Sequence, residues 1–129
     1  VTACPGPIVA AALPRLGLTK YFDVIVTADD VRRHKPDPEA LLLALDRLGA
    51  STAHAVMIGD SKADMLAGKA AACATALFLP DDHLPFYSFA ALEATEPDFV
   101  FSDHRDLARW LRVEDPPCDS SVVLGERHG

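Results

Sequence analysis

A short apolar run that stops at an acidic turn is the feature that most constrains how this chain can fold. Residues 55–58 read Ala-Val-Met-Ile, and Gly59-Asp60-Ser61 follows at once, ahead of a run of small residues with helical character. An apolar run of this length, bounded by turn residues, is typical of a strand buried on both faces of a parallel sheet. Asp60 is therefore expected at the carboxyl end of the sheet, where open α/β folds bind their ligands.

Asp60 and Asp64 are spaced so that both carboxylates can face one crevice if a helix begins between them. Two acidic oxygen donors suit a hard cation such as Mg²⁺, which usually takes one or two carboxylates together with phosphate oxygens and water. The residues alone leave a second interpretation open. In it, Asp60 or Ser61 only caps the helix, and Asp64 is a solvated acid of the first turn.

A second motif lies upstream and contains a lysine between turn residues. The run Lys35-Pro36-Asp37-Pro38-Glu39 leads into a helical pattern, with Asp37 expected as the N-cap and Pro38 at the first turn. The two prolines and the expected cap restrict the backbone beside Lys35, so its ammonium group is expected to have a defined direction. The pattern favours a functional lysine over an ordinary solvated one.

Taken together, Lys35-Pro36-Asp37-Pro38 and Gly59-Asp60-Ser61-Lys62-Ala63-Asp64 resemble the third and fourth motifs of the haloacid dehalogenase (HAD) superfamily. The closer resemblance is to the subgroup that contains phosphoglycolate phosphatase and other small sugar-phosphate phosphatases. The run Leu-Thr-Lys-Tyr-Phe-Asp-Val-Ile-Val at residues 18–26 is similar to that subgroup as well. The resemblance covers residues 1–112, with two motifs in the right order at a plausible spacing.

The resemblance implies a role for each matching residue. Asp60 would hold Mg²⁺ directly, and Asp64 would bind the ion or orient its ligands. Lys35 would offset the negative charge of the nucleophile and of the phosphoryl group. Thr2 matches the Ser or Thr of the second motif, whose hydroxyl holds a phosphoryl oxygen. The implied reaction is hydrolysis of a small phosphorylated metabolite through an aspartyl-phosphate.

One part of the family's site is missing from the sequence. HAD phosphatases use an Asp nucleophile in an Asp-x-Asp-Gly-Thr motif at the end of their first strand, and no such run occurs among these 129 residues. We therefore expect a C-terminal part that lacks the central first strand and the cap domain that selects the substrate. The 129 residues alone are expected to be inactive. The exposed neighbours of the missing strand would invite pairing or aggregation.

The expected fold class is α/β, a partial Rossmann-like three-layer parallel sheet that lacks its central strand. Residues 1–112 would form this incomplete core, and residues 113–129 would form a weakly docked tail. Asp29 and Asp30 are interpreted as solvated acids of a loop, and a supporting role behind the metal ligands is the less favoured alternative. Strands are expected at residues 1–4, 23–27, 55–58, 75–79 and 99–101, and helices at residues 6–16, 38–48, 63–72 and 86–94 and after residue 102.

Charge and cysteine content exclude other classes of protein. The net charge is −7, from 12 basic and 19 acidic residues without a basic cluster, which argues against nucleic acid or an anionic membrane as the partner. No run approaches the length of a membrane span. Cys4, Cys73 and Cys118 lie far apart and in no metal-ligand spacing, so we expect reduced thiols in a cytoplasmic protein.

Several alternatives stay open at this point. A dehalogenase typically carries Ser-x-Asn where this chain has Gly59-Asp60-Ser61, which favours a phosphatase, but a sugar-phosphate mutase shares the motifs. From another class, the chain could be a non-catalytic phosphate- or metal-binding relative. A receiver-type signalling domain with Asp60 as phospho-acceptor is disfavoured, because those domains place the lysine after the acceptor and Lys35 precedes Asp60.

Overall fold

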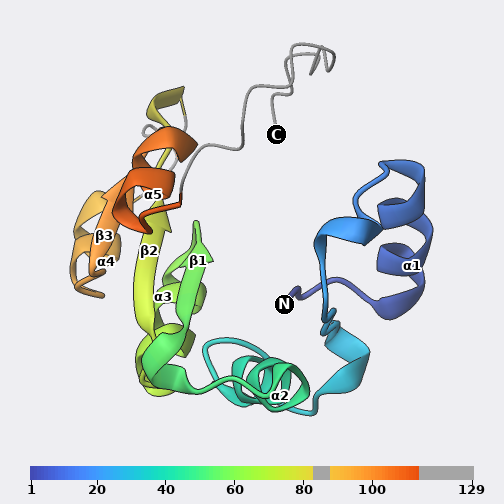
Figure 1. The fold of residues 1–129 in the computed structure, drawn as a ribbon. Coiled ribbons are helices and arrows are strands. Elements are labelled where there is room, and N and C mark those ends of the chain that lie inside the picture. The colour runs from blue at the N-terminus through green and yellow to red at the C-terminus, as the bar shows by residue number, and fades with distance from the viewer. Residues whose placement is uncertain (83–87, 114–129) are drawn as a thin grey trace, which may run out of the picture.

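A three-stranded parallel sheet is the centre of the fold in the computed structural model, which describes residues 1–82 and 88–113 (Figure 1). The strands lie side by side in the order in which they occur along the chain. They are β1 (Val56–Gly59), β2 (Ala74–Phe78) and β3 (Phe99–Phe101). The expectation of an α/β fold with a parallel sheet is confirmed.

The connections between strands bring their carboxyl ends to one edge. α3 (Lys62–Ala70) connects β1 to β2, and α4 (Phe89–Glu93) lies between β2 and β3. Val56 at the start of β1 is paired with Ala74 at the start of β2. All three strands therefore end on the same side of the sheet, where the loop between β1 and α3 presents Asp60.

Helices cover both faces of the sheet, which gives the three layers expected from the sequence. On one face Leu77 of β2 packs with Met65 of α3. On the other face Ala76 packs with Leu107 of α5 (His104–Trp110). Ala76 and Leu77 are neighbours that face opposite layers, as the two-residue period of a strand requires.

Gly68 allows α3 to lie close against the sheet. A Cβ at this position would lie 2.6 Å from Cγ2 of Thr75 and 2.9 Å from Cβ of Met57. Thr75 and Met57 belong to β2 and β1, so the helix backbone rests directly on two strands. The run of small residues from Ala63 to Ala72 meets the expectation of close packing drawn from the sequence.

The segments at residues 1–4 and 23–27 are not strands, so this prediction was wrong. Their backbones lie side by side, but only two main-chain hydrogen bonds join this part of the chain, one of them from Thr2 N to Val26 O at 2.9 Å. Two isolated bonds do not form the continuous ladder of a sheet. Among the described residues, neither segment pairs with β1.

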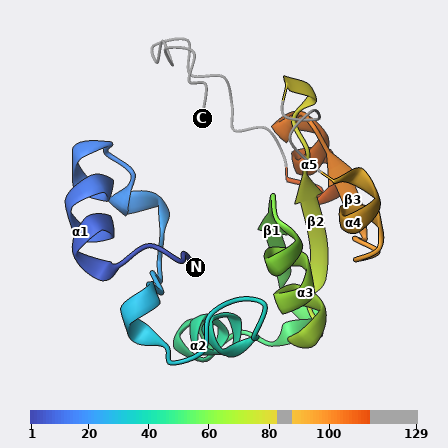
Figure 2. The same cartoon turned by 180° about the vertical axis from the view of Figure 1, so that it is seen from behind.

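The N-terminal helix α1 (Gly6–Arg15) lies across from the sheet, and α2 (Glu39–Leu48) connects the two sides (Figure 1). Figure 2 shows the same arrangement from behind, with the N-terminus between α1 and β1. Among the described residues, the remaining helices are three short 3₁₀ turns at Thr19–Tyr21, Ala28–Asp30 and Thr52–His54. α1 and the segment between α1 and α2 thus form a separate group beside the sheet.

Two expectations extend beyond the described residues. α4 accounts for the described part of the helix expected at residues 86–94, of which 86 and 87 lie outside the described ranges. The expected tail at residues 113–129 lies outside them except for Val113. In the part of the chain that is described, no helix is long and apolar enough to cross a membrane.

Candidate functional site

Lys35 and Asp64 form an ion pair at the carboxyl edge of β1. The Nζ of Lys35 lies 2.5 Å from Oδ1 of Asp64. The two side chains are only 17% and 7% exposed, so solvent screens this pair less than an ordinary surface pair. The sequence indicated a function for each residue separately, and the structure brings them into contact across 29 positions of the chain.

The other carboxylate oxygen of Asp64 holds the loop between β1 and α3. Oδ2 accepts the backbone N–H groups of Asp60 and Ser61, each at 3.2 Å. Ser61 is the N-cap of α3, and its hydroxyl accepts the Asp64 N–H at 3.1 Å, which completes a capping box. Ser61 is therefore a helix cap. Asp64 is 5% exposed and is not the solvated acid of the second interpretation.

Gly59 makes room for the carboxylate of Asp64. A Cβ at position 59 would lie 2.5 Å from both Cβ and Cγ of Asp64, closer than real side-chain atoms approach one another. A larger residue at the end of β1 would push Asp64 away from the loop and from Lys35. The Gly-Asp pair of the motif therefore has a steric reason as well as a chemical one.

The surroundings of Asp64 keep its carboxyl group charged. Burial alone would raise the pKa of Asp64, but hydrogen bonds from Lys35 and Ser61 and the charge of Lys35 act in the opposite direction. The net result is a pKa below the ordinary value of 3.8. At neutral pH Asp64 is a carboxylate matched to the ammonium group of Lys35.

Asp60 is the acidic side chain at this edge that is open to a ligand. It is exposed, and its carboxylate has no hydrogen bond or ion pair among the described residues. Free carboxylate oxygens suit a hard cation. Within the described ranges, no three His, Cys, Asp or Glu side chains converge. A cation at Asp60 would therefore complete its coordination with phosphate oxygens and water, as Mg²⁺ commonly does.

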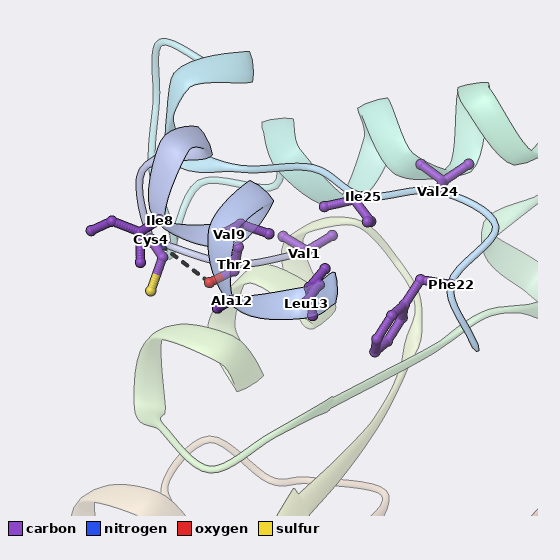
Figure 3. Close-up of a pocket in the computed structure, with 10 residues that line it drawn as sticks. All are labelled: Val1, Thr2, Cys4, Ile8, Val9, Ala12, Leu13, Phe22, Val24 and Ile25. Atoms are coloured by element: carbon purple, nitrogen blue, oxygen red, sulfur yellow. Dashed lines mark hydrogen bonds between the residues drawn. The ribbon is translucent and has the colours of Figure 1, made fainter. Parts of the chain in front are cut away.

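Thr2 lies beside a small apolar cavity next to α1 (Figure 3). The cavity has a volume of about 260 Å³. The Oγ1 of Thr2 accepts the Cys4 N–H at 3.1 Å, which leaves the hydroxyl proton available for an acceptor. No hydrogen bond joins Thr2 to Lys35 or Asp64 in the described structure.

The preceding residue nevertheless lies near the sheet. Val1 lines a second cavity together with Met57 and Ile58 of β1. The start of the described chain therefore lies close to β1. Lys35 and Asp60 are brought to the same region through Asp64, and Thr2 follows Val1 on a separate segment.

The structure also gives roles to two acids that the sequence analysis assigned to solvent. Asp29 Oδ2 accepts the Gly6 N–H at 2.6 Å, and Asp30 Oδ2 accepts the Thr27 N–H at 2.7 Å. Both side chains are exposed, as the interpretation of solvated acids expected, but it missed these hydrogen bonds to the backbone. The role of Asp30 could have been predicted from the sequence, because Thr27 and Asp30 have the Thr-x-x-acid spacing of a capping box, which they form in the structure.

The fold and the site together define a parallel α/β protein with a lysine–carboxylate pair and an open carboxylate at the carboxyl edge of its sheet. A family model described as haloacid dehalogenase-like hydrolase matches residues 1–78. The chain belongs to the haloacid dehalogenase-like hydrolase family. The resemblance inferred from the two motifs is thereby confirmed.

Individual proteins agree with this assignment. The chain is similar to the phosphoglycolate phosphatase of Salmonella paratyphi A, with 39% identity over 128 residues that are 98% of this chain and 48% of that protein. It is similar in structure to a HAD phosphatase from Thermococcus onnurineus, with a TM-score of 0.69, 28% identity and coverage of 83% of this chain and 46% of the other.

A third similar protein is a provisionally named β-phosphoglucomutase from Thermotoga maritima, with a TM-score of 0.72, 30% identity and coverage of 86% of this chain and 50% of the other. A phosphatase and a mutase thus share this part of the fold. The chain spans about half the length of the curated relatives it matches.

Proposed function

We propose that these residues are the C-terminal part of a Mg²⁺-dependent phosphatase that acts on a small phosphorylated metabolite. The Lys35–Asp64 ion pair beside the open carboxylate of Asp60 is the observation that carries the proposal. A fixed cation next to an oxygen ligand for a metal suits a phosphoryl group, whose negative charge must be offset during transfer. Relatives named phosphoglycolate phosphatase support the substrate class.

Each residue would have a distinct role. Asp60 would be the carboxylate ligand of Mg²⁺, which when bound neutralises charge on the phosphoryl oxygens. Lys35 would offset the remaining negative charge of the phosphoryl group, and Thr2 would donate its hydroxyl proton to one phosphoryl oxygen. These roles would come from three separate segments of the chain.

Asp64 would act mainly by orienting Lys35 and the loop that carries Asp60. Its two carboxylate oxygens already accept hydrogen bonds from Lys35, Asp60 and Ser61. A direct bond from Asp64 to Mg²⁺ would compete with one of these contacts. Asp64 as a metal ligand, the other role inferred from the sequence, stays a prediction.

The nucleophile would be an Asp outside these 129 residues. Its carboxylate oxygen would bond to phosphorus while the bond to the ester oxygen breaks, and the leaving alcohol would take up a proton. Water would then attack phosphorus, releasing inorganic phosphate and restoring the carboxylate. The residues described here would bind phosphate and Mg²⁺ but would not turn over substrate alone.

The sheet offers a place for the strand that would carry this nucleophile. β1 pairs only with β2 among the described residues, so its other edge has unpaired backbone groups. Ile58 of β1 is 44% exposed, which is unusual for an apolar strand residue in a parallel sheet. A further parallel strand on this edge would end beside Asp60.

A cytoplasmic location is part of the proposal, supported by the free thiols of Cys4 and Cys73.

The proposal is tested by phosphate release from 2-phosphoglycolate and other small esters, using the protein expressed from its complete coding region. Hydrolysis is expected with Mg²⁺ and is expected to stop when EDTA removes the ion. Asp60→Asn and Lys35→Met should abolish it. Asp46→Asn, a change at an exposed acid of α2, should leave it intact. Full activity in Asp60→Asn would overturn the proposal.

A sugar-phosphate mutase is the second candidate, because the chain is similar to the provisionally named β-phosphoglucomutase. The two activities differ in product. A mutase would convert β-glucose 1-phosphate to glucose 6-phosphate without net release of inorganic phosphate, and phosphorus NMR separates these outcomes.

A further inference from the structure

We propose that Asp29 is a positioning residue for the loop that contains Thr2, an inference that rests on the proposed function. Asp29 does not reach the ion pair at the edge of β1. Its carboxylate instead holds the far end of the segment that carries the Thr2 hydroxyl. Asp29 would therefore affect phosphate binding through Thr2 and not by contact with the ligand.

The carboxylate of Asp29 caps α1 from a distant part of the chain. Pro5 is the N-cap residue of α1 and has no side-chain capping hydrogen bond. The Gly6 N–H, the first donor of the helix, is satisfied by Asp29 Oδ2 at 2.6 Å across 23 positions. A negative charge here also complements the positive end of the helix dipole. The start of α1 thus depends on Asp29.

The loop from Thr2 to Gly6 is held at three points against residues 26–29. The three hydrogen bonds are Thr2 N to Val26 O (2.9 Å), Ala28 N to Cys4 O (3.0 Å) and Gly6 N to Asp29 Oδ2 (2.6 Å). The bond to Asp29 is the one that a side chain provides, so it is the one that substitution can remove. Its loss would free the end of the loop and let the Thr2 hydroxyl move.

Gly6 is small enough for this contact, and a larger residue would disturb it. A Cβ at position 6 would lie 3.0 Å from Asp29 Oδ2 and 3.3 Å from Thr27 Oγ1. Both distances are tighter than ordinary contacts, so the carboxylate would have to shift. Gly6→Ala is therefore a second way to weaken the same interaction without removing the charge.

The adjacent Asp30 ties the turn that carries Asp29 to α2. Asp30 Oδ2 accepts from the N–H and hydroxyl of Thr27 at 2.7 and 3.0 Å. The Asp30 Oδ1 also lies 3.6 Å from a guanidinium nitrogen of Arg47 on α2. Arg47 lies in the last turn of α2, so this ion pair fixes the turn that carries Asp29 against the C-terminal end of that helix.

A double-mutant cycle tests the inference in the protein expressed from its complete coding region. Binding of inorganic phosphate in the presence of Mg²⁺ is measured by calorimetry for the unsubstituted protein, Asp29→Ala, Thr2→Ala and the double variant. Loss of one capping interaction should weaken binding about fivefold in Asp29→Ala. If Asp29 acts through Thr2, Asp29→Ala should lower phosphate affinity by less than about twofold when Thr2 is already replaced by Ala.

Three further variants distinguish positioning from general destabilisation. Asp29→Asn keeps an acceptor oxygen for the Gly6 N–H and should restore binding to within about twofold of the unsubstituted protein. Gly6→Ala should weaken binding in the same way as Asp29→Ala. Asp46→Ala, at an exposed acid of α2, should have no effect. Amide exchange of Gly6 should speed up in Asp29→Ala, as expected for a lost hydrogen bond.

The outcomes separate the inference from the proposed function. Equal loss of phosphate affinity from Asp29→Ala in both backgrounds would overturn the inference, because a structural effect does not depend on Thr2. An unchanged affinity in Asp29→Ala would overturn it as well. If the unsubstituted protein neither binds phosphate nor hydrolyses phosphate esters, the proposed function fails and the inference falls with it.

Discussion

The ammonium group of Lys35 lies 2.5 Å from Oδ1 of Asp64, and the other oxygen of that carboxylate holds the backbone of Asp60. Three residues from two separate sequence motifs are therefore one connected unit. Lys35 comes from the segment before α2, whereas Asp60 and Asp64 follow β1. The ion pair consequently links the N-terminal half of the chain to the sheet. A substitution of Lys35 should therefore alter the position of Asp64 and of the Asp60 loop, and a substitution of Asp64 should alter the position of Lys35.

Replacing Lys35 should destabilise the protein, because it leaves the Asp64 carboxylate without its cation. Lys35→Met is expected to lower the free energy of unfolding by about 2 kcal/mol, in the range for a hydrogen bond to a charged group. Unfolding in urea, followed by circular dichroism, measures the change. Lys69→Met is the control, because its ammonium lies 4.0 Å from Asp98 and both side chains are more exposed. That exposed pair should contribute less than about 1 kcal/mol, and equal losses would contradict the argument.

The lowered pKa of Asp64 predicts acid sensitivity. Its pKa in the folded protein lies below 3.8, the value expected when the chain is unfolded, so the folded state favours the carboxylate. This contribution to stability is present above about pH 4 and is lost as the pH falls through the folded-state pKa. Urea midpoints between pH 7 and pH 3 should decline less steeply in Asp64→Asn. The control Asp46→Asn should show the same decline of the urea midpoint as the unsubstituted protein. A steeper decline in Asp64→Asn would contradict the prediction.

Gly68→Ala should destabilise the protein, although the same change at an exposed helix position would stabilise it by about 1 kcal/mol. The new Cβ would lie 2.6 Å from Thr75 Cγ2, and Thr75 is completely buried. Overpacking of this kind costs about 1–3 kcal/mol. The sign of the change in thermal midpoint decides between the two cases, and a higher midpoint would show that α3 does not rest on β2 at this point.

Local patterns in the sequence predicted the elements around the site correctly. The apolar run that ends at Gly59 became β1, and the small residues after Ser61 became α3 with its cap. The strands expected at residues 1–4 and 23–27 did not form. An apolar, β-branched run indicates only that a segment suits a strand. Whether it becomes one depends on a neighbouring ladder, which the run itself does not contain.

Contacts between distant segments lay beyond the reach of such patterns. The pairing of Lys35 with Asp64 spans 29 positions, and the capping of Gly6 by Asp29 spans 23. Neither follows a helical or strand period, so nothing local distinguishes Asp29 from a solvated loop acid. The sequence could therefore single out candidate residues for the edge of β1, but not show that Asp64 joins Lys35 to the backbone of Asp60.

Ala72 occupies a backbone conformation that favours glycine. Its φ is +57°, and it directly follows Ala71, the C-cap of α3. The Ala72 N–H bonds to Lys69 O at 3.0 Å and the Cys73 N–H to Gly68 O at 2.9 Å, the pair of bonds that defines a Schellman motif. Gly49 occupies the equivalent left-handed position after α2, with a φ of +63°.

Ala72→Gly should therefore stabilise the protein. Relief of left-handed strain gains about 1–2 kcal/mol, and the greater freedom of glycine in the unfolded chain offsets about 0.5–1 kcal/mol of it. The net expectation is a gain of about 0.5–1 kcal/mol, measured by urea unfolding. Ala70→Gly is the control, because Ala70 is the last residue of α3 and has no left-handed φ, so the same substitution there should lower stability by up to about 1 kcal/mol. If both variants lose stability equally, residue 72 does not adopt the left-handed conformation. α3 would then end in another way before β2.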